Sequence, residues 1–99
     1  MKILSKDVAK FYQINSLNRG HLIFTSLIAK DGKMLFLDSH IKRLLKGASF
    51  LFPEFKWSES HAEVKQYIED VFKEDRSDSY FRLTVFDDCL YLEKKLFEC

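Results

Sequence analysis

The chain has 99 residues, of which 46% are hydrophobic and 15% aromatic. This composition indicates one well-packed domain, which we expect to span residues 1–99, and is not that of a disordered chain. The formal net charge is only +1, so we expect neither nucleic acid nor an anionic membrane as a partner.

The first third of the chain predicts a β-hairpin. The segment "VAKFYQIN" (8–15) is compatible with a short strand or a helical turn. The stretch from His21 to Ala29 is rich in β-branched and aromatic residues, which predicts a strand. Asp31-Gly32 suits a tight turn that needs positive φ angles, and "MLFL" (34–37) predicts the partner strand.

The stretch "DSHIKRLLKGASFLF" (38–52) predicts a helix. Either Asp38 or Ser39 is expected to cap its N-terminus, since each side chain can accept from free backbone N–H groups. Pro53 should end the helix, because the residue before a proline disfavours helical geometry. Apolar residues at helical spacing form one stripe: Ile41, Leu44, Leu45, Ala48, Leu51 and Phe52.

His40, Arg43 and Gly47 fall together on one shoulder of this helix, beside the stripe. A glycine inside a helix costs about 1 kcal/mol relative to alanine, so another surface is expected to approach closely. An arginine beside such a gap could bind an anion through its guanidinium fork. The alternative is that Arg43 only covers apolar surface and Gly47 admits a bulky core neighbour such as Phe50 or Trp57.

A second helix follows, with Ser60 and Glu63 at capping-box spacing. Its apolar face is predicted to comprise Val64, Tyr67, Ile68, Val71 and Phe72. After the polar loop "KEDRSDS", the stretch "YFRLTVF" (80–86) alternates as a strand. Asp87-Asp88 is a plausible turn, and "CLYLEKKLF" (89–97) predicts a last strand, at an edge of the sheet.

The order strand, strand, helix, helix, strand, strand predicts an α+β fold. Because hairpins join neighbouring strands, the sheet should be antiparallel, with both helices on one face in a two-layer sandwich.

Cysteines and histidines do not form a recognisable metal site. Cys89 and Cys99 lack the second pair that a zinc site would need, and we expect reduced thiols. His21, His40 and His61 are scattered without ligand spacing. No stretch approaches the roughly 20 apolar residues of a membrane-spanning helix. The start of the chain lacks the apolar core of a secretory signal, so a cytoplasmic protein is expected.

The run "FTSLIAKDGKMLFLDSHIKRLLKGASFL" (24–51) resembles the N-terminal half of the class IV aminotransferases, the fold-type IV pyridoxal-phosphate enzymes. The likeness lies in a strand with Phe24 and Thr25, a hairpin with Asp-Gly, and then His-x-x-Arg-Leu, here His40, Arg43 and Leu44. Asn18-Arg19-Gly20 resembles an element before the first strand, and "YFRLTVFDD" (80–88) resembles the strand after the helices.

This resemblance implies that Arg43 binds the phosphate of pyridoxal 5′-phosphate, with His40 in support. The similarity of "FTSLIAKDGK" to the 4-amino-4-deoxychorismate lyase branch favours that lyase among the family's activities. The family's Schiff-base lysine lies on a second domain, and no lysine of this chain matches it. We therefore expect no catalytic residue here and no activity of the 99-residue chain alone. Cofactor binding would require the C-terminal domain that holds the lysine, and the expected partner is that domain or a second copy in a homodimer.

The alternative function is a non-enzymatic interaction or dimerisation domain that retains the scaffold. In that case an exposed sheet face carrying Phe81, Leu83 and Val85 would contact the partner.

Overall fold

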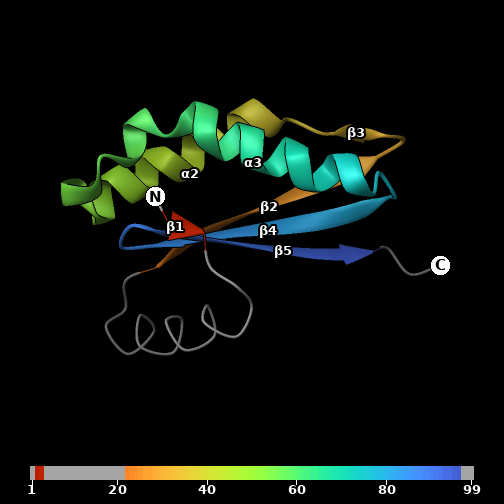
Figure 1. The fold of residues 1–99 in the computed structure, drawn as a ribbon. Helices are drawn as coiled ribbons and strands as arrows, with labels where there is room; N and C mark the ends of the chain where they lie inside the picture. Colours follow the sequence, from red (N-terminus) through yellow and green to blue (C-terminus); the bar gives the residue numbers. More distant parts are fainter. Residues whose placement is uncertain (1, 4–21, 97–99) are drawn as a thin grey trace.

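Two α-helices cover one face of a five-stranded β-sheet in a computed structural model of the protein, which describes residues 2–3 and 22–96 (Figure 1). Two short 3-10 turns, Pro53–Phe55 and Trp57–Glu59, connect the helices. The predicted α+β sandwich is confirmed, with its strands and helices in the predicted order from β2 onward. The main elements are β1 (Lys2–Ile3), β2 (Ile23–Lys30), β3 (Lys33–Met34), α2 (Leu37–Leu51), α3 (His61–Glu74), β4 (Ser79–Phe86) and β5 (Cys89–Leu96).

The strands are arranged in the order β1-β5-β4-β2-β3. β4 lies at the centre and pairs antiparallel with β2 on one side and with β5 on the other. β1 adds a short parallel partner to β5 at Cys89 and Leu90, so β5 is an edge strand of the described sheet only beyond that point. The expectations for segments 8–15 and 18–20 concern residues outside the described part of the chain.

The first hairpin turns where the sequence predicts, but its second strand is shorter than expected. Asp31 and Gly32 both have positive φ angles, 54° and 76°, as a tight two-residue turn requires. β3 ends at Met34, and the prediction of a strand to Leu37 is wrong. Phe36 adopts the left-handed conformation (φ 56°), which turns the chain out of the sheet and into α2.

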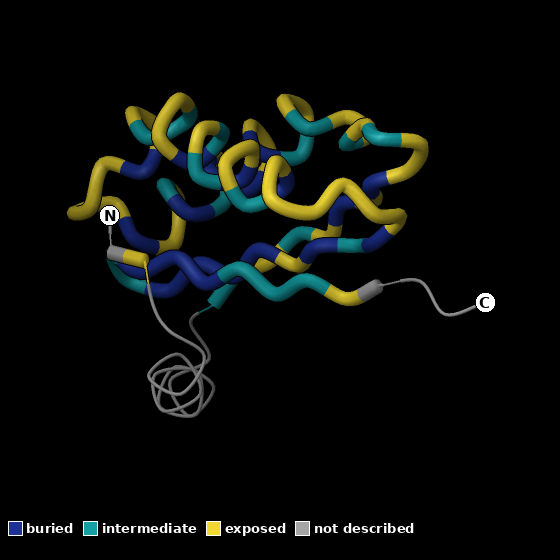
Figure 2. The backbone as a smooth tube through the Cα atoms, turned by 45° about the vertical axis from the view of Figure 1, so that its right-hand side comes forward, coloured by how far each residue is buried: buried dark blue, intermediate teal, exposed yellow. Residues whose placement is uncertain are grey.

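The core lies between the helix layer and the sheet. Figure 2 shows buried backbone along the sheet and along the sides of the helices that face it. Phe81, Leu83 and Val85 of β4 are fully buried in the core that the helices share. The suggestion that these three side chains form an exposed partner surface is therefore wrong. Phe24 and Ile28 of β2, at the alternate positions, are about half exposed at 51% and 47% and point to the opposite face of the sheet.

The apolar stripes of both helices are largely confirmed. The buried residues of α2 are Ile41, Leu44, Leu45 and Ala48, whereas Leu51 is 39% exposed and does not belong to the stripe. In α3, Val64, Ile68 and Phe72 are buried, and Tyr67 and Val71 pack against the core.

The capping prediction is wrong for α2, and for α3 it is right only in the position of the cap. α2 begins at Leu37 after Phe36, so neither Asp38 nor Ser39 is its N-cap, and no side chain caps it. Ser60 occupies the N-cap position of α3 without making a side-chain cap hydrogen bond. The helices therefore depend on packing and on contacts between elements more than on local caps.

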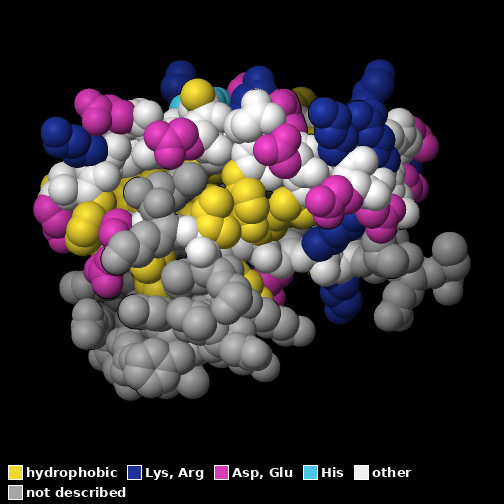
Figure 3. All heavy atoms as spheres, in the orientation of Figure 1, with side chains coloured by type: hydrophobic (Ala, Val, Ile, Leu, Met, Phe, Trp, Pro, Cys, Tyr) yellow, Lys and Arg dark blue, Asp and Glu magenta, His cyan; other side chains and the backbone are white. Residues whose placement is uncertain are grey.

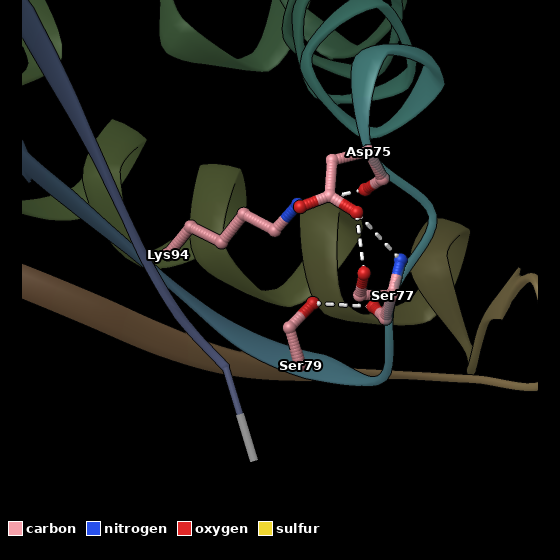
Figure 4. Close-up of polar contacts among 4 residues, drawn as sticks. All are labelled: Asp75, Ser77, Ser79 and Lys94. Carbon is pink, nitrogen blue, oxygen red and sulfur yellow. Dashed lines mark hydrogen bonds and ion pairs between the residues drawn. The ribbon is translucent and has the colours of Figure 1, made fainter. Parts of the chain in front are cut away.

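One such contact fixes the connection from α3 to β4 (Figure 4). The carboxylate of Asp75 accepts hydrogen bonds from the hydroxyl and the backbone N–H of Ser77, which lower the pKa of Asp75. Lys94 of β5 donates to the Asp75 carbonyl at 2.7 Å and lies 3.4 Å from its carboxylate. Ser79 Oγ donates to the Ser77 carbonyl at 3.0 Å. The C-terminal end of α3 is thereby tied to β5.

Gly47 allows α2 to approach β2 closely. A Cβ atom at this position would collide with Cδ1 of Ile23, while Cγ1 of Ile23 would lie at an ordinary contact distance of 3.6 Å. The close neighbour is therefore Ile23, and not Phe50 or Trp57 as the sequence suggested.

Gly47→Ala is expected to affect stability differently in two backgrounds. Alanine contributes up to about 1 kcal/mol of helix propensity, but in the wild type it must displace Cδ1 of Ile23, and overpacking typically costs about 1–3 kcal/mol. The Ile23→Val background lacks Cδ1, so Gly47→Ala should raise the free energy of unfolding there. The change caused by Gly47→Ala should be more favourable in this background than in the wild type by about 1 kcal/mol or more. A double-mutant cycle by urea unfolding measures this difference. Equal effects of Gly47→Ala in both backgrounds would contradict the close contact.

Candidate functional site

His40 and Arg43 lie on the side of α2 that faces the N-terminal half of β2. Nδ1 of His40 is 3.0 Å from Oγ1 of Thr25, on β2. Nη2 of Arg43 is 3.4 Å from the same Nδ1 atom. These three residues, the Thr25–His40–Arg43 cluster, form a row of contacts from β2 to the exposed Arg43. His40 and Arg43 lie on the same side of α2, as the helical spacing predicted.

The surroundings of His40 favour its neutral form. Burial lowers the pKa of His40 below its ordinary value of 6.5, and the positive charge of Arg43 lowers it further. Both effects disfavour a second positive charge beside Arg43.

The Arg43 guanidinium is available to bind an anion. Arg43 is exposed, and none of the ion pairs within residues 2–3 and 22–96 involves it. A hollow of about 380 Å³ lies beside it, lined by Ile23, Phe24, Thr25, Ser26, Arg43 and Leu44. These lining residues include neither a carboxylate that would repel an anion nor a lysine.

The same hollow lies along an open edge of β2. β3 pairs with β2 only at Ala29 and Lys30, and the Leu35 N–H donates to the Ile28 carbonyl at 2.8 Å. Backbone polar groups alternate in direction along an antiparallel strand, so those of Ser26 and Phe24 point the same way as those of Ile28. β4 pairs with β2 at these two residues on the other edge, but on this edge no described strand pairs with them.

The groups around the hollow fit a phosphate or another oxyanion. A guanidinium presents parallel N–H donors that match phosphate oxygens, and the backbone N–H of Ser26 adds a neutral donor on the open strand edge. The Ser26 hydroxyl is a further hydrogen-bonding group, since this residue is exposed and lines the hollow. The chemistry available here is anion binding and orientation.

A larger hollow of about 500 Å³ lies between the β2–β3 turn and α3, away from Arg43. Its lining mixes the cations Lys33, Lys73 and Arg76 with Glu69 and Asp70. Figure 3 likewise shows acidic and basic side chains interspersed over the helix layer on the face that it views. We therefore place the candidate site at the smaller hollow, where the cation has no acidic partner in the described chain.

Two further searches cover the described residues alone. They contain no group of three or more His, Cys, Asp and Glu side chains that could hold a metal ion. They also contain no helix that is long and apolar enough to cross a membrane.

Sequence reasoning missed the site residues of β2. The sequence marks Thr25 only through the family pattern, and no motif marks Ser26. The available signal was the two-residue period of the strand, which places Ile23 and Thr25 on one face, together with Gly47, which marks a close approach to α2.

Asp38 braces the start of α2 against α3. Its carboxylate accepts from His61 Nε2 at 3.0 Å and lies 3.1 Å from Lys65 Nζ. The hydrogen bond from His61 and then the one from Lys65 lower the pKa of Asp38 below its ordinary value of 3.8. This contact lies one turn before Arg43 and helps to fix the direction of the helix that carries it.

A comparison with protein-family models matches residues 22–96 to the model described as amino-transferase class IV. Neither a search of curated proteins nor a search of solved structures returns a match.

Asp38→Asn should lower the free energy of unfolding at pH 7, and the loss should become smaller in acid. Because the folded state lowers the pKa of Asp38, its contribution is present above about pH 4 and is lost as the pH falls through the folded-state value. Urea unfolding of the wild type and the variant at pH 7 and at pH 3 measures this effect. Glu69→Gln is the control, because no described residue forms an ion pair with Glu69. A deficit of Asp38→Asn that persists unchanged at pH 3 would contradict the brace.

Proposed function

Because the chain belongs to the class IV aminotransferase family, we propose that it forms the small domain of a pyridoxal-phosphate-dependent aminotransferase or lyase. In this proposal Arg43 binds the phosphate of the cofactor. The observation that carries it is the exposed guanidinium, with no acidic partner in the described chain, over a hollow on an open strand edge. Pyridoxal phosphate, where bound, supplies the electron sink of the reaction.

Each residue around the hollow has a distinct part in this proposal. Arg43 donates two parallel N–H groups to phosphate oxygens and fixes the position of the phosphate. The Ser26 backbone N–H donates from the strand edge. His40 lies behind Arg43, with its Nδ1 atom directed at the guanidinium and at Thr25, so it supports the arginine and does not itself bind the phosphate.

The covalent anchor of the cofactor would come from outside this hollow, because no lysine is among its lining residues. We place that lysine on a complementary C-terminal domain. The outer face of the sheet is the surface that such a domain or a second subunit would cover, because Phe24 and Ile28 are half exposed there. The Arg82 guanidinium stacks at 4.5 Å on the Phe24 ring, which adds a cation to the same face.

Within the family we favour the lyase that releases pyruvate from 4-amino-4-deoxychorismate to give 4-aminobenzoate. The support is the likeness of "FTSLIAKDGK" to that branch. We assign the activity to the cytoplasm, where the buried thiol of Cys89 would stay reduced. In a preparation that contains the lysine-bearing domain, pyruvate release without an amino acceptor would support the lyase. Dependence on a 2-oxo acid would show an aminotransferase instead.

The alternative, a non-enzymatic interaction domain, would use the same half-exposed outer face with Phe24 and Ile28. It differs in that Arg43 would have no ligand. The phosphate selectivity of Arg43 therefore separates the two functions.

In a preparation that contains the lysine-bearing domain, Arg43→Ala should weaken binding of a phosphorylated pyridoxal analogue by about tenfold or more, because charge-assisted hydrogen bonds contribute about 1.5–3 kcal/mol. Pyridoxamine 5′-phosphate is the suitable probe, since it cannot form imines with surface lysines. Titration followed by NMR should shift the amide signals of Phe24, Ser26 and Arg43, and pyridoxamine without the phosphate should not shift them. Arg43→Lys should recover only part of the affinity, because an ammonium group lacks the fork.

Lys42→Ala is the matched control for charge. Lys42 is an exposed cation on the neighbouring position of α2 and does not line this hollow, so its removal should leave binding unchanged. If Lys42→Ala and Arg43→Ala weaken binding equally, the effect is general electrostatics and the role of Arg43 is wrong.

A further inference from the structure

The Thr25–His40–Arg43 cluster has one arrangement of protons that satisfies every contact. A guanidinium has only N–H donors, so Arg43 can bond to Nδ1 of His40 only if that atom is an acceptor. The Thr25 hydroxyl must then donate to Nδ1 as well, at 3.0 Å. The imidazole proton is consequently on Nε2. Protonation of Nδ1 would break the contact with Arg43, whereas the Thr25 hydroxyl would reverse and accept from Nδ1–H.

The charged groups near His40 favour this neutral form. On α2, Arg43 is the cation that acts on the ring. The nearest acid along the helix, Asp38, directs its carboxylate to His61 and Lys65 of α3. On β2, the residues that share a face with Thr25 are Ile23 and Leu27, which carry no charge. Among the described residues nothing offsets the repulsion between Arg43 and a protonated His40.

We propose that Thr25 and His40 are positioning residues that hold the Arg43 guanidinium over the hollow, and that acidification releases this hold by protonating His40 at Nδ1. The proposal rests on the function assigned to Arg43 above and adds a regulation of that site. Its consequence is that anion binding weakens as the pH falls, although the total positive charge of the site increases.

The sign of this pH effect separates positioning from direct contact. If His40 touched the anion itself, its protonation would add a cation and tighten binding. If His40 instead orients Arg43, protonation removes the acceptor that aligns the guanidinium, and binding weakens. Sulfate is the suitable probe because it remains a dianion from pH 5 to pH 8, whereas a phosphate group itself gains a proton in that range.

The first measurement examines the cluster without any ligand. Long-range ¹H–¹⁵N NMR of the ligand-free protein should show His40 as the Nε2–H tautomer, with a pKa below 6.5. Thr25→Val keeps the β-branched shape and removes the hydroxyl, so it should mix the tautomers and increase the mobility of the Arg43 side chain. Thr25→Ser should restore the single Nε2–H tautomer and the lower mobility of the Arg43 side chain. An Nδ1–H tautomer in the wild type would overturn the proposal whatever the protein binds. So would a Thr25→Val variant in which the His40 tautomer and the Arg43 mobility are the same as in the wild type.

The second measurement follows sulfate binding to Arg43 by NMR at pH 7.5 and pH 5. In the wild type the Kd should rise about threefold to tenfold on acidification, the equivalent of one lost hydrogen bond. His40→Asn places a non-titrating oxygen acceptor near the position of Nδ1, so it should bind as the wild type does at pH 7.5 and lose the pH dependence. His40→Leu should bind weakly at both pH values.

Tighter sulfate binding at pH 5, or a Kd that does not change with pH, would overturn the positioning role. If sulfate binds at neither pH while the Nε2–H tautomer is present, the anion-binding function of Arg43 is refuted instead. The proposed function and the proposed regulation therefore fail in different experiments.

Discussion

The close packing of α2 on the N-terminal half of β2 is the constraint on which the candidate site depends. Gly47 permits it, because any side chain there would occupy the space of Ile23 Cδ1. Two residues further along β2, on the same face, Thr25 meets His40 at hydrogen-bonding distance. A helix set further from the sheet would leave His40 without its partner on β2, and Arg43 would project from an unsupported shoulder.

No side chain caps the N-terminus of α2. Contacts with other elements hold the helix near both of its ends. At its start, Asp38 joins it to His61 and Lys65 of α3. After its end, Trp57 donates from Nε1 to the Asp87 carbonyl at 2.6 Å, which ties the connection between the helices to the β4–β5 turn. The helix that carries Arg43 is thus fixed along its side by β2, at its start by α3 and beyond its end by the sheet.

Hydrophobic periodicity predicts the layers, the two helices and the three long strands β2, β4 and β5, because burial on one face imposes a period of 3.6 or 2 residues. The same reasoning placed His40, Arg43 and Gly47 on one shoulder. It failed where a single backbone angle or a non-local contact decides the outcome. Phe36 takes a left-handed conformation that few bulky residues adopt, so the strand expected to reach Leu37 stops at Met34. The partners of Gly47 and His40 come from β2, and spacing within a helix carries no information about them.

The His-x-x-Arg spacing has a physical meaning that the structure makes explicit. Residues three apart lie on one side of a helix, so the arginine can donate back to the histidine while its remaining N–H groups face outward. The histidine alone would bind an anion weakly and in a pH-dependent way, and the arginine alone would be a flexible cation on the surface. Paired with a hydroxyl on the adjoining strand, the histidine lowers the orientational freedom of the arginine, which reduces the entropy that a bound anion would otherwise have to overcome. The open edge of β2 adds directional donors at the same place, because β3 is too short to use them. The early end of β3 and the close approach at Gly47 therefore act together: one exposes backbone donors beside the hollow, and the other brings the oriented guanidinium to them.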